Sequence, residues 1–195
     1  MYYVVPSLKR ATQIELSNVP RTATPADIRR LVARSQIGGV EQVDIEYRRL
    51  EPSGRAYLQL THADFLLPGL DALEKVTISG VHPVAKPSDR KPRPDVVGET
   101  GDGISSELAR DGKNAVVWGL PRRAGPELLD SLLGGFKFPP GEPYIFPLPM
   151  PEYFTMYSRF LVCLQSVSEA HRLVRQLHMT YHFDHKFQIR ARVIY

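Results

Sequence analysis

Apolar and polar residues follow regular patterns in two stretches of this chain, separated by a segment without a pattern. In the first stretch, apolar residues alternate with polar ones, as in half-buried strands. Between these strands, apolar residues recur at helical spacing, for example at Ile28, Leu31 and Val32. The first stretch is therefore predicted to contain four strands, at 14–19, 43–47, 55–60 and 81–85.

Capping and turn residues predict where the helices and turns of the first stretch lie. The run 24–27, Thr-Pro-Ala-Asp, predicts a helix start, because it supplies an N-cap, a proline at the first position and an acid at the third. The pair Gly38-Gly39 is predicted to end this helix. Residues 52–54, Pro-Ser-Gly, are predicted to form the turn before the third strand. Residues 61–64 are predicted to cap a second helix. The pair Pro68-Gly69 should kink this helix or delay its start until Leu70.

The second stretch repeats this order. Ser166-Val-Ser-Glu169 has the form of a capping box, and Ala170, Leu173, Val174 and Leu177 follow it at the spacing of an amphipathic helix. A Pro- and aromatic-rich run at 136–157 is predicted to hold the second strand and a long loop. The remaining predicted elements are strands at 115–121, 159–164 and 187–193 and a helix at 126–133, which Gly134-Gly135 should end.

The repetition predicts two copies of one folding unit with the order β-α-β-β-α-β. Equivalent features lie about one hundred residues apart, as with Pro20 and Pro121. The segment between the copies is rich in proline, glycine and alternating charges, which is typical of a flexible linker. We therefore expect a first domain at 11–86, a linker at 87–113 and a second domain at 114–195.

The chain resembles the RNA recognition motif (RRM) family. The element order, the proline that closes each first strand and the Ile78-Ser79-Gly80 run before a last strand carry this resemblance. The resemblance implies an α+β fold with two ferredoxin-like sandwiches, each a four-stranded antiparallel sheet with two helices. It also implies that the first and third strands lie side by side and present base-stacking aromatic residues.

In the first domain only part of this stacking chemistry is present. Matched to the family pattern, the two stacking positions of the third strand hold Arg55 and Tyr57, which are expected to contact RNA. The stacking position of the first strand holds Glu15, which repels phosphate. Asp44 and Glu46 are expected on the same face.

In the second domain the stacking positions are Val116, Arg159 and Leu161, and Trp118 should project from the same face. This largely apolar face is expected to be covered, by the Pro-rich loop, by the linker or, as we favour, by another protein. Val116, Trp118 and Leu161 are thus a predicted protein-docking face. The arginines predicted to contribute charge to RNA binding, in chain order, are Arg48, Arg159, Arg190 and Arg192.

Composition narrows the functional classes. The net charge is +4 and the pI is about 9.2, which suits a polyanionic partner without requiring one. The single cysteine, Cys163, excludes an intramolecular disulfide. Four histidines near the C-terminus lack ligands at convincing spacing, so no metal site is expected. No catalytic motif, nucleotide-binding loop or membrane-length apolar run is found, and we expect no enzyme activity, no cofactor and no membrane partner.

The sequence predicts a non-catalytic protein that binds single-stranded RNA, mainly through the first domain, with a protein partner on the second. The alternative is a protein-interaction module of degenerate RRMs within a larger assembly. An intracellular location is expected. Nucleus, cytoplasm and mitochondrion remain open, and the basic, acid-free start before Glu15 favours the mitochondrion.

Overall fold

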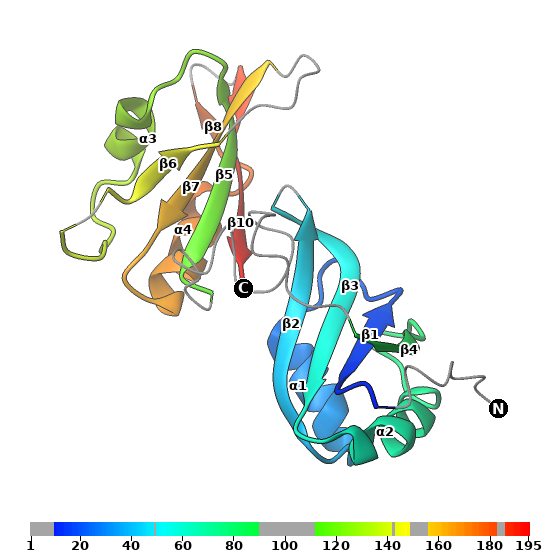
Figure 1. Ribbon diagram of the computed structural model, residues 1–195. Coiled ribbons are helices and arrows are strands. Elements are labelled where there is room, and N and C mark those ends of the chain that lie inside the picture. Colours follow the sequence, from blue (N-terminus) through cyan, green and yellow to red (C-terminus); the bar gives the residue numbers. More distant parts are fainter. Residues whose placement is uncertain (1–9, 49, 90–111, 142, 149–155, 183–185) are drawn as a thin grey trace. The chain divides into compact units, whose positions relative to one another are not determined.

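The computed structural model divides into two compact units, Met1–Ser106 and Glu107–Tyr195, called domain 1 and domain 2 below (Figure 1). It describes residues 10–48, 50–89, 112–141, 143–148, 156–182 and 186–195. Most of the expected linker at 87–113 lies outside these described residues. The last strand of domain 1 continues to Ser88, two residues beyond the expected boundary.

Domain 1 has the β-α-β-β-α-β order expected from the sequence. Its four strands form one antiparallel sheet with the spatial order β2-β3-β1-β4, so the first and third strands lie in the centre. The elements are β1 (Gln13–Ser17), α1 (Pro25–Arg34), β2 (Val40–Arg48), β3 (Glu51–Leu60), a 3-10 turn (Ala63–Phe65), α2 (Leu66–Leu73) and β4 (Val84–Ser88).

Domain 2 repeats this topology, with one added hairpin. Its main sheet has the order β10-β5-β7-β6, again antiparallel, and β8 pairs with β9 in a separate two-stranded ribbon. Both domains are therefore α+β sandwiches of the ferredoxin-like type, as predicted. The elements are β5 (Asn114–Pro121), α3 (Pro126–Leu132), β6 (Ile145–Pro147), β7 (Tyr157–Cys163), α4 (Val167–Leu177), β8 (Tyr181–His182), β9 (Phe187–Gln188) and β10 (Arg190–Ile194).

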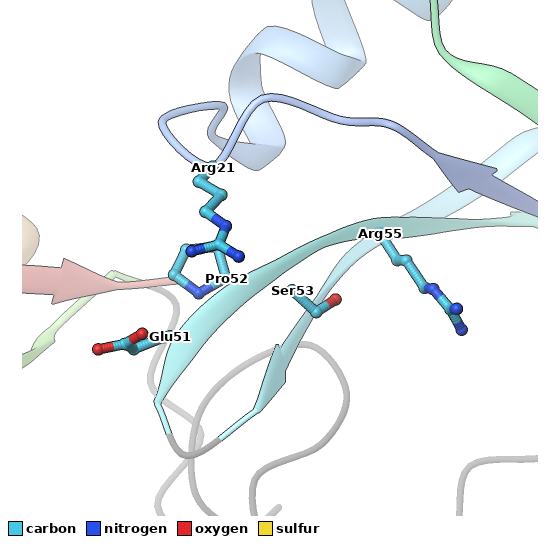
Figure 2. A pocket seen from close by; sticks show the side chains of 5 residues that line it. All are labelled: Arg21, Glu51, Pro52, Ser53 and Arg55. Atoms are coloured by element: carbon cyan, nitrogen blue, oxygen red, sulfur yellow. The ribbon is translucent and has the colours of Figure 1, made fainter.

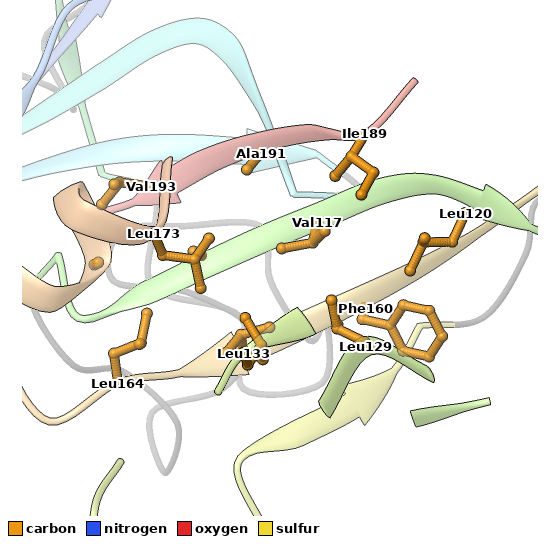
Figure 3. Packing of buried hydrophobic residues seen from close by; sticks show 13 residues of the cluster. Val117, Leu120, Leu129, Leu133, Phe160, Leu164, Leu173, Ile189, Ala191 and Val193 are labelled. Carbon is orange, nitrogen blue, oxygen red and sulfur yellow. The ribbon is translucent and has the colours of Figure 1, made fainter. Parts of the chain in front are cut away.

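The core of domain 2 lies between its sheet and its two helices (Figure 3). Alternate residues of β5 and β7, among them Val117 and Phe160, meet Leu129 of α3 and Leu173 of α4 in this core. Because side chains alternate across a strand, the intervening residues point to the other side of the sheet. We call that side, turned away from the helices, the outer face.

In domain 1 the same alternation separates a core face from an outer face. Ile14 pairs with Leu58 and both are fully buried. The side chain of Ile14 points at α2, since its Cδ1 lies 3.1 Å from the place that a Cβ on Gly69 would take. The neighbours of Ile14 and Leu58 along the strands, Glu15 and Tyr57, therefore lie on the outer face.

Helix α1 starts as the sequence predicts. Thr24 is the N-cap, Pro25 occupies the first turn and Asp27 completes a capping box. The Asp27 carboxylate accepts hydrogen bonds from the Thr24 backbone N–H at 2.9 Å and from its hydroxyl at 2.8 Å. These bonds, the backbone one foremost, hold the pKa of Asp27 below its ordinary value.

Replacing this cap should cost moderate stability with a defined pH dependence. Thr24→Ala is expected to lower the free energy of unfolding by about 1 kcal/mol at neutral pH. Because folding lowers the pKa of Asp27, the stability that its charge contributes is present above pH 3.8, its ordinary pKa, and disappears as the pH falls through the lowered value. Urea unfolding of wild type and Asp27→Asn should therefore differ at pH 7 and converge at low pH. A constant difference in unfolding free energy between wild type and Asp27→Asn from pH 7 to low pH would contradict a stabilising charge at Asp27.

Two predicted boundaries of domain 1 are wrong. Helix α1 ends at Arg34, before the Gly38-Gly39 pair, because Ser35 satisfies the last turn through its backbone N–H and its hydroxyl, both bonded to the Leu31 carbonyl. The predicted turn at 52–54 lies inside β3. The ladder between β2 and β3 continues beyond it to the pair Arg48–Glu51.

The second half of domain 1 also departs from the prediction. Helix α2 begins at Leu66, and Pro68 lies in its first turn, where a missing N–H costs no helical hydrogen bond. Residues 61–64 supply no side-chain cap. The last strand begins at Val84, because Ile78 and Val81 close a tight turn through two backbone hydrogen bonds of 2.8 and 2.9 Å.

In domain 2 the helix boundaries agree more closely with the sequence. Helix α3 ends just before the Gly134-Gly135 pair. Ser166 caps α4 by accepting from the Glu169 N–H, but only this half of the capping box forms. The Glu169 carboxylate instead accepts from the Lys137 N–H and from Arg172, which lowers its pKa, mainly through the Lys137 bond. The hydrogen bond from Lys137 to Glu169 joins the segment after α3 to the start of α4.

Candidate nucleic-acid interface

Tyr57, the predicted stacking residue of domain 1, lies on the outer face but is almost completely buried. It pairs with Glu15 of β1 on one side and with Asp44 of β2 on the other. Only 3% of its surface is exposed, and its hydroxyl lies 3.5 Å from a carboxylate oxygen of Glu46. Stacking of a base on Tyr57 would require the side chains around the ring to move away.

Arg55, the other predicted contact on β3, is engaged by carboxylates. Its guanidinium lies 3.5 Å from Glu15 and 4.0 Å from Glu46. Glu46 is fully buried and also accepts a short hydrogen bond from the Ser53 hydroxyl. The positive charge of Arg55 is therefore largely offset by its neighbours. The side chain of Arg48 lies outside the described residues.

A shallow pocket beside this network does not form an anion site. It is lined by Arg21, Glu51, Pro52, Ser53 and Arg55. Figure 2 shows the guanidinium groups of Arg21 and Arg55 pointing in different directions, with the Glu51 carboxylate at the pocket as well. Phosphate recognition by a pocket needs donors that converge on one point, and this pocket lacks that convergence.

The outer face of domain 2 brings one aromatic ring and three arginines together. Trp118 of β5 pairs with Arg159 of β7 on one side and with Arg190 of β10 on the other. The guanidinium of Arg192 lies over the indole ring, 5.7 Å from its centre, within the range of a cation–π contact. Within the part of the chain that the structure describes, neither Arg190 nor Arg192 forms an ion pair. We call these four residues the Trp118 cluster.

A bulge in β5 lies directly after Trp118. The pairing of β5 with β7 shifts register between Trp118 and Leu120, and the intervening Gly119 has a φ of +102°. The Gln188 carbonyl approaches so closely that a Cβ on Gly119 would lie 2.0 Å from its oxygen. Glycine is therefore required at 119, and the sequence alone gave no sign of this requirement.

The two aliphatic members of the predicted docking face are buried. Val116 is 2% exposed and Leu161 is fully buried. Phe146 of the Pro-rich run pairs with Leu161 as a neighbouring strand residue. Of the three predicted docking residues, Trp118 alone is partly exposed in the structure.

Sequence reasoning missed a second aromatic residue near the cluster. Tyr157 is two residues before Arg159 on β7, so it lies on the same face, and it is 43% exposed. The ring centres of Tyr157 and Phe187 are 6.3 Å apart, and the two rings are nearly perpendicular. The signal that could have identified Tyr157 was its spacing, because it is two residues from Arg159, which the sequence already placed on this face.

Other kinds of site receive no support from the described residues. Among them, no group of three or more metal-ligating side chains is found. No described helix is long and apolar enough to cross a membrane. His178 and His182, two of the four histidines near the C-terminus, lie on different elements, and His178 Nδ1 accepts a hydrogen bond from the Ala191 N–H.

Comparisons with known proteins give similarity at the level of structure only. No family model matches the chain, and no curated protein matches it. Among solved structures, RNA recognition domains 1 and 2 of Sex-lethal from Drosophila melanogaster are 16% identical to this chain, with a TM-score of 0.34. The match covers 93% of this chain and 98% of the Sex-lethal chain. The first two RRM domains of yeast poly(U)-binding protein Pub1 are 11% identical, with a TM-score of 0.35, and the match covers 93% of this chain and 98% of the Pub1 chain. The RRM3 domain of Hrb1 matches 46% of this chain with 19% identity, all of its own length and a TM-score of 0.38. At these scores, the fold assignment rests on the sheet order of the chain itself.

Proposed function

We propose that this protein binds single-stranded RNA without catalysing a reaction, and that the outer face of domain 2 makes the main contact. The observation that carries the proposal is the Trp118 cluster. The Arg192 guanidinium lies over the indole, and Arg159 and Arg190 pair with Trp118 on the two neighbouring strands. An aromatic ring among arginines on a sheet face suits a nucleic acid with unpaired bases. The arginines supply phosphate contacts, and the ring supplies a surface for a base.

The same reasoning makes domain 1 a weaker RNA surface than the sequence predicted. Arg55 is paired with Glu15 and Glu46, whereas Arg190 and Arg192 are exposed. A carboxylate on a sheet face repels phosphate, so each acid on the outer face of domain 1 opposes RNA binding there. Contacts from Tyr57, Arg55 and Arg48 are therefore proposed only as secondary ones.

Removing the two exposed arginines should weaken RNA binding and reduce its dependence on salt. We expect the double variant Arg190→Ala with Arg192→Ala to lower the slope of log affinity against log salt by about 1.4, since each contact to a single strand contributes about 0.7. The measurement is fluorescence anisotropy of an end-labelled, mixed-sequence single-stranded RNA at several salt concentrations, with the full chain.

The matched control removes the same charge from the helices. Arg29 of α1 and Arg175 of α4 are both exposed, and replacing both by alanine changes the net charge equally. The control should keep the wild-type slope. Equal loss in both double variants would mean that net charge alone attracts the RNA, and the proposed surface would be wrong.

A second candidate function is docking of a basic protein segment on domain 1. The observation that favours it is the pair of acids Glu15 and Asp44, which flank Tyr57 on the two neighbouring strands of the outer face. Such a face suits an arginine or lysine side chain better than a phosphate. If wild type shows no salt-sensitive RNA binding in the titration above, this second function replaces the first.

A further inference from the structure

Trp118 and Tyr157 occupy positions that differ from those at which RRMs ordinarily stack bases. In domain 2 those ordinary positions hold Val116, Arg159 and Leu161, none of which is aromatic. Trp118 is displaced along β5 by two residues from Val116, and Tyr157 along β7 by two residues from Arg159. Both aromatic rings are thus moved toward the same end of the sheet, because β5 and β7 run antiparallel and Pro121 pairs with Tyr157.

The surroundings of the two rings leave surface for a ligand. Tyr157 is 43% exposed, and its ring stands nearly at a right angle to that of Phe187. Trp118 is partly exposed. Arg192 lies over the indole, 5.7 Å from its centre, so a base that stacks on this face of the ring takes the place of the guanidinium, and the displaced guanidinium then bonds the neighbouring phosphate.

We infer that Trp118 and Tyr157 form a base-stacking site for unpaired nucleotides at this end of domain 2, with Arg190 and Arg192 on the phosphates beside them. The inference rests on the proposed RNA-binding function and adds to it a second ring, Tyr157, and discrimination against duplex RNA, because only unpaired bases expose faces to stack. Trp118 thereby becomes an RNA contact rather than a protein-docking residue.

The chain offers a direct probe of this site. Trp118 is its single tryptophan, so intrinsic tryptophan fluorescence reports on this position alone. A base stacked on an indole quenches its emission. We expect a 12-nucleotide single-stranded RNA to quench the emission of the full chain over the same concentration range as binding measured by anisotropy. An abasic oligonucleotide of equal length and a duplex of the same sequence should bind by charge with little quenching.

Two substitutions separate stacking from structure. Trp118→Leu should weaken single-stranded RNA binding about tenfold while leaving the salt slope unchanged, since indole carries no charge. Trp118→Tyr should restore most of the affinity, because a tyrosine ring can still stack. Tyr157→Leu should produce a smaller loss. Circular dichroism and thermal unfolding of each variant show whether domain 2 is folded.

The outcomes distinguish the inference from the function on which it rests. If anisotropy shows RNA binding but the tryptophan emission does not change, the stacking site is overturned and RNA binding remains. Full RNA affinity in a folded Trp118→Leu variant would have the same meaning. Equal quenching by the abasic strand would also overturn stacking. Absence of any RNA binding by wild type would overturn both the site and the proposed function.

Discussion

Gly119→Ala is expected to destabilise domain 2 by about 3 kcal/mol or more, one of the largest effects of a single methyl group in this chain. The new Cβ would lie 2.0 Å from the Gln188 carbonyl oxygen, and a backbone atom cannot rotate away as a side chain can. The φ of +102° adds strain, because residues with a Cβ rarely adopt it. The measurement is urea unfolding followed by Trp118 emission, which reports on domain 2.

A matched glycine provides the control for this prediction. Gly134 has an ordinary φ and open space around its Cα, so Gly134→Ala should change the free energy of unfolding by less than about 0.5 kcal/mol. Because the bulge at Gly119 positions Trp118 beside Arg159, a folded fraction of Gly119→Ala should also bind RNA less well. A near-wild-type unfolding midpoint for Gly119→Ala would show that the bulge is not as tight as described.

Phe160→Ala should destabilise domain 2 to a similar extent, by about 3–5 kcal/mol. Phe160 is 1% exposed and lies in the core between β7 and the helices (Figure 3). Truncation removes buried apolar surface and leaves a cavity that its neighbours Leu120 and Leu129 can fill only in part. The same urea titration measures the effect.

Surface substitution on the same domain gives the comparison for Phe160. Val167, at the start of α4, is 39% exposed, so Val167→Ala should shift the midpoint only slightly. Comparable shifts for the two variants would place Phe160 outside the core and contradict the packing described above.

Local signals in the sequence predicted the fold because each depends on one or two neighbouring residues. Thr24 and Ser166 cap helices through their own hydroxyls, and Pro25 favours a first turn by its fixed φ. The alternation of apolar residues at 43–47 and 187–193 indicated the core face of each sheet, and Val43, Ile45, Ala191 and Val193 are indeed buried. Repetition of this order in both halves then fixed the topology.

Features that depend on pairing between distant residues could not be predicted. The bulge at Gly119 exists because β5 passes close to Gln188, and the continuation of β3 through 52–54 exists because β2 pairs with it there. The pairing of Arg55 with Glu15 is likewise a contact between strands. Such pairing decides whether an arginine can bind phosphate, and it is the reason that we propose the main RNA surface on domain 2.

The most direct test of this account is a two-dimensional ¹H–¹⁵N NMR titration of the full chain with single-stranded RNA. The single indole N–H of Trp118 gives one resolved side-chain signal. The account predicts that this signal and the backbone amides of Arg159, Arg190 and Arg192 shift together at the lowest RNA concentrations, while those of Glu15 and Tyr57 change little. Early shifts confined to Glu15 and Tyr57, with the indole signal unmoved, would contradict it.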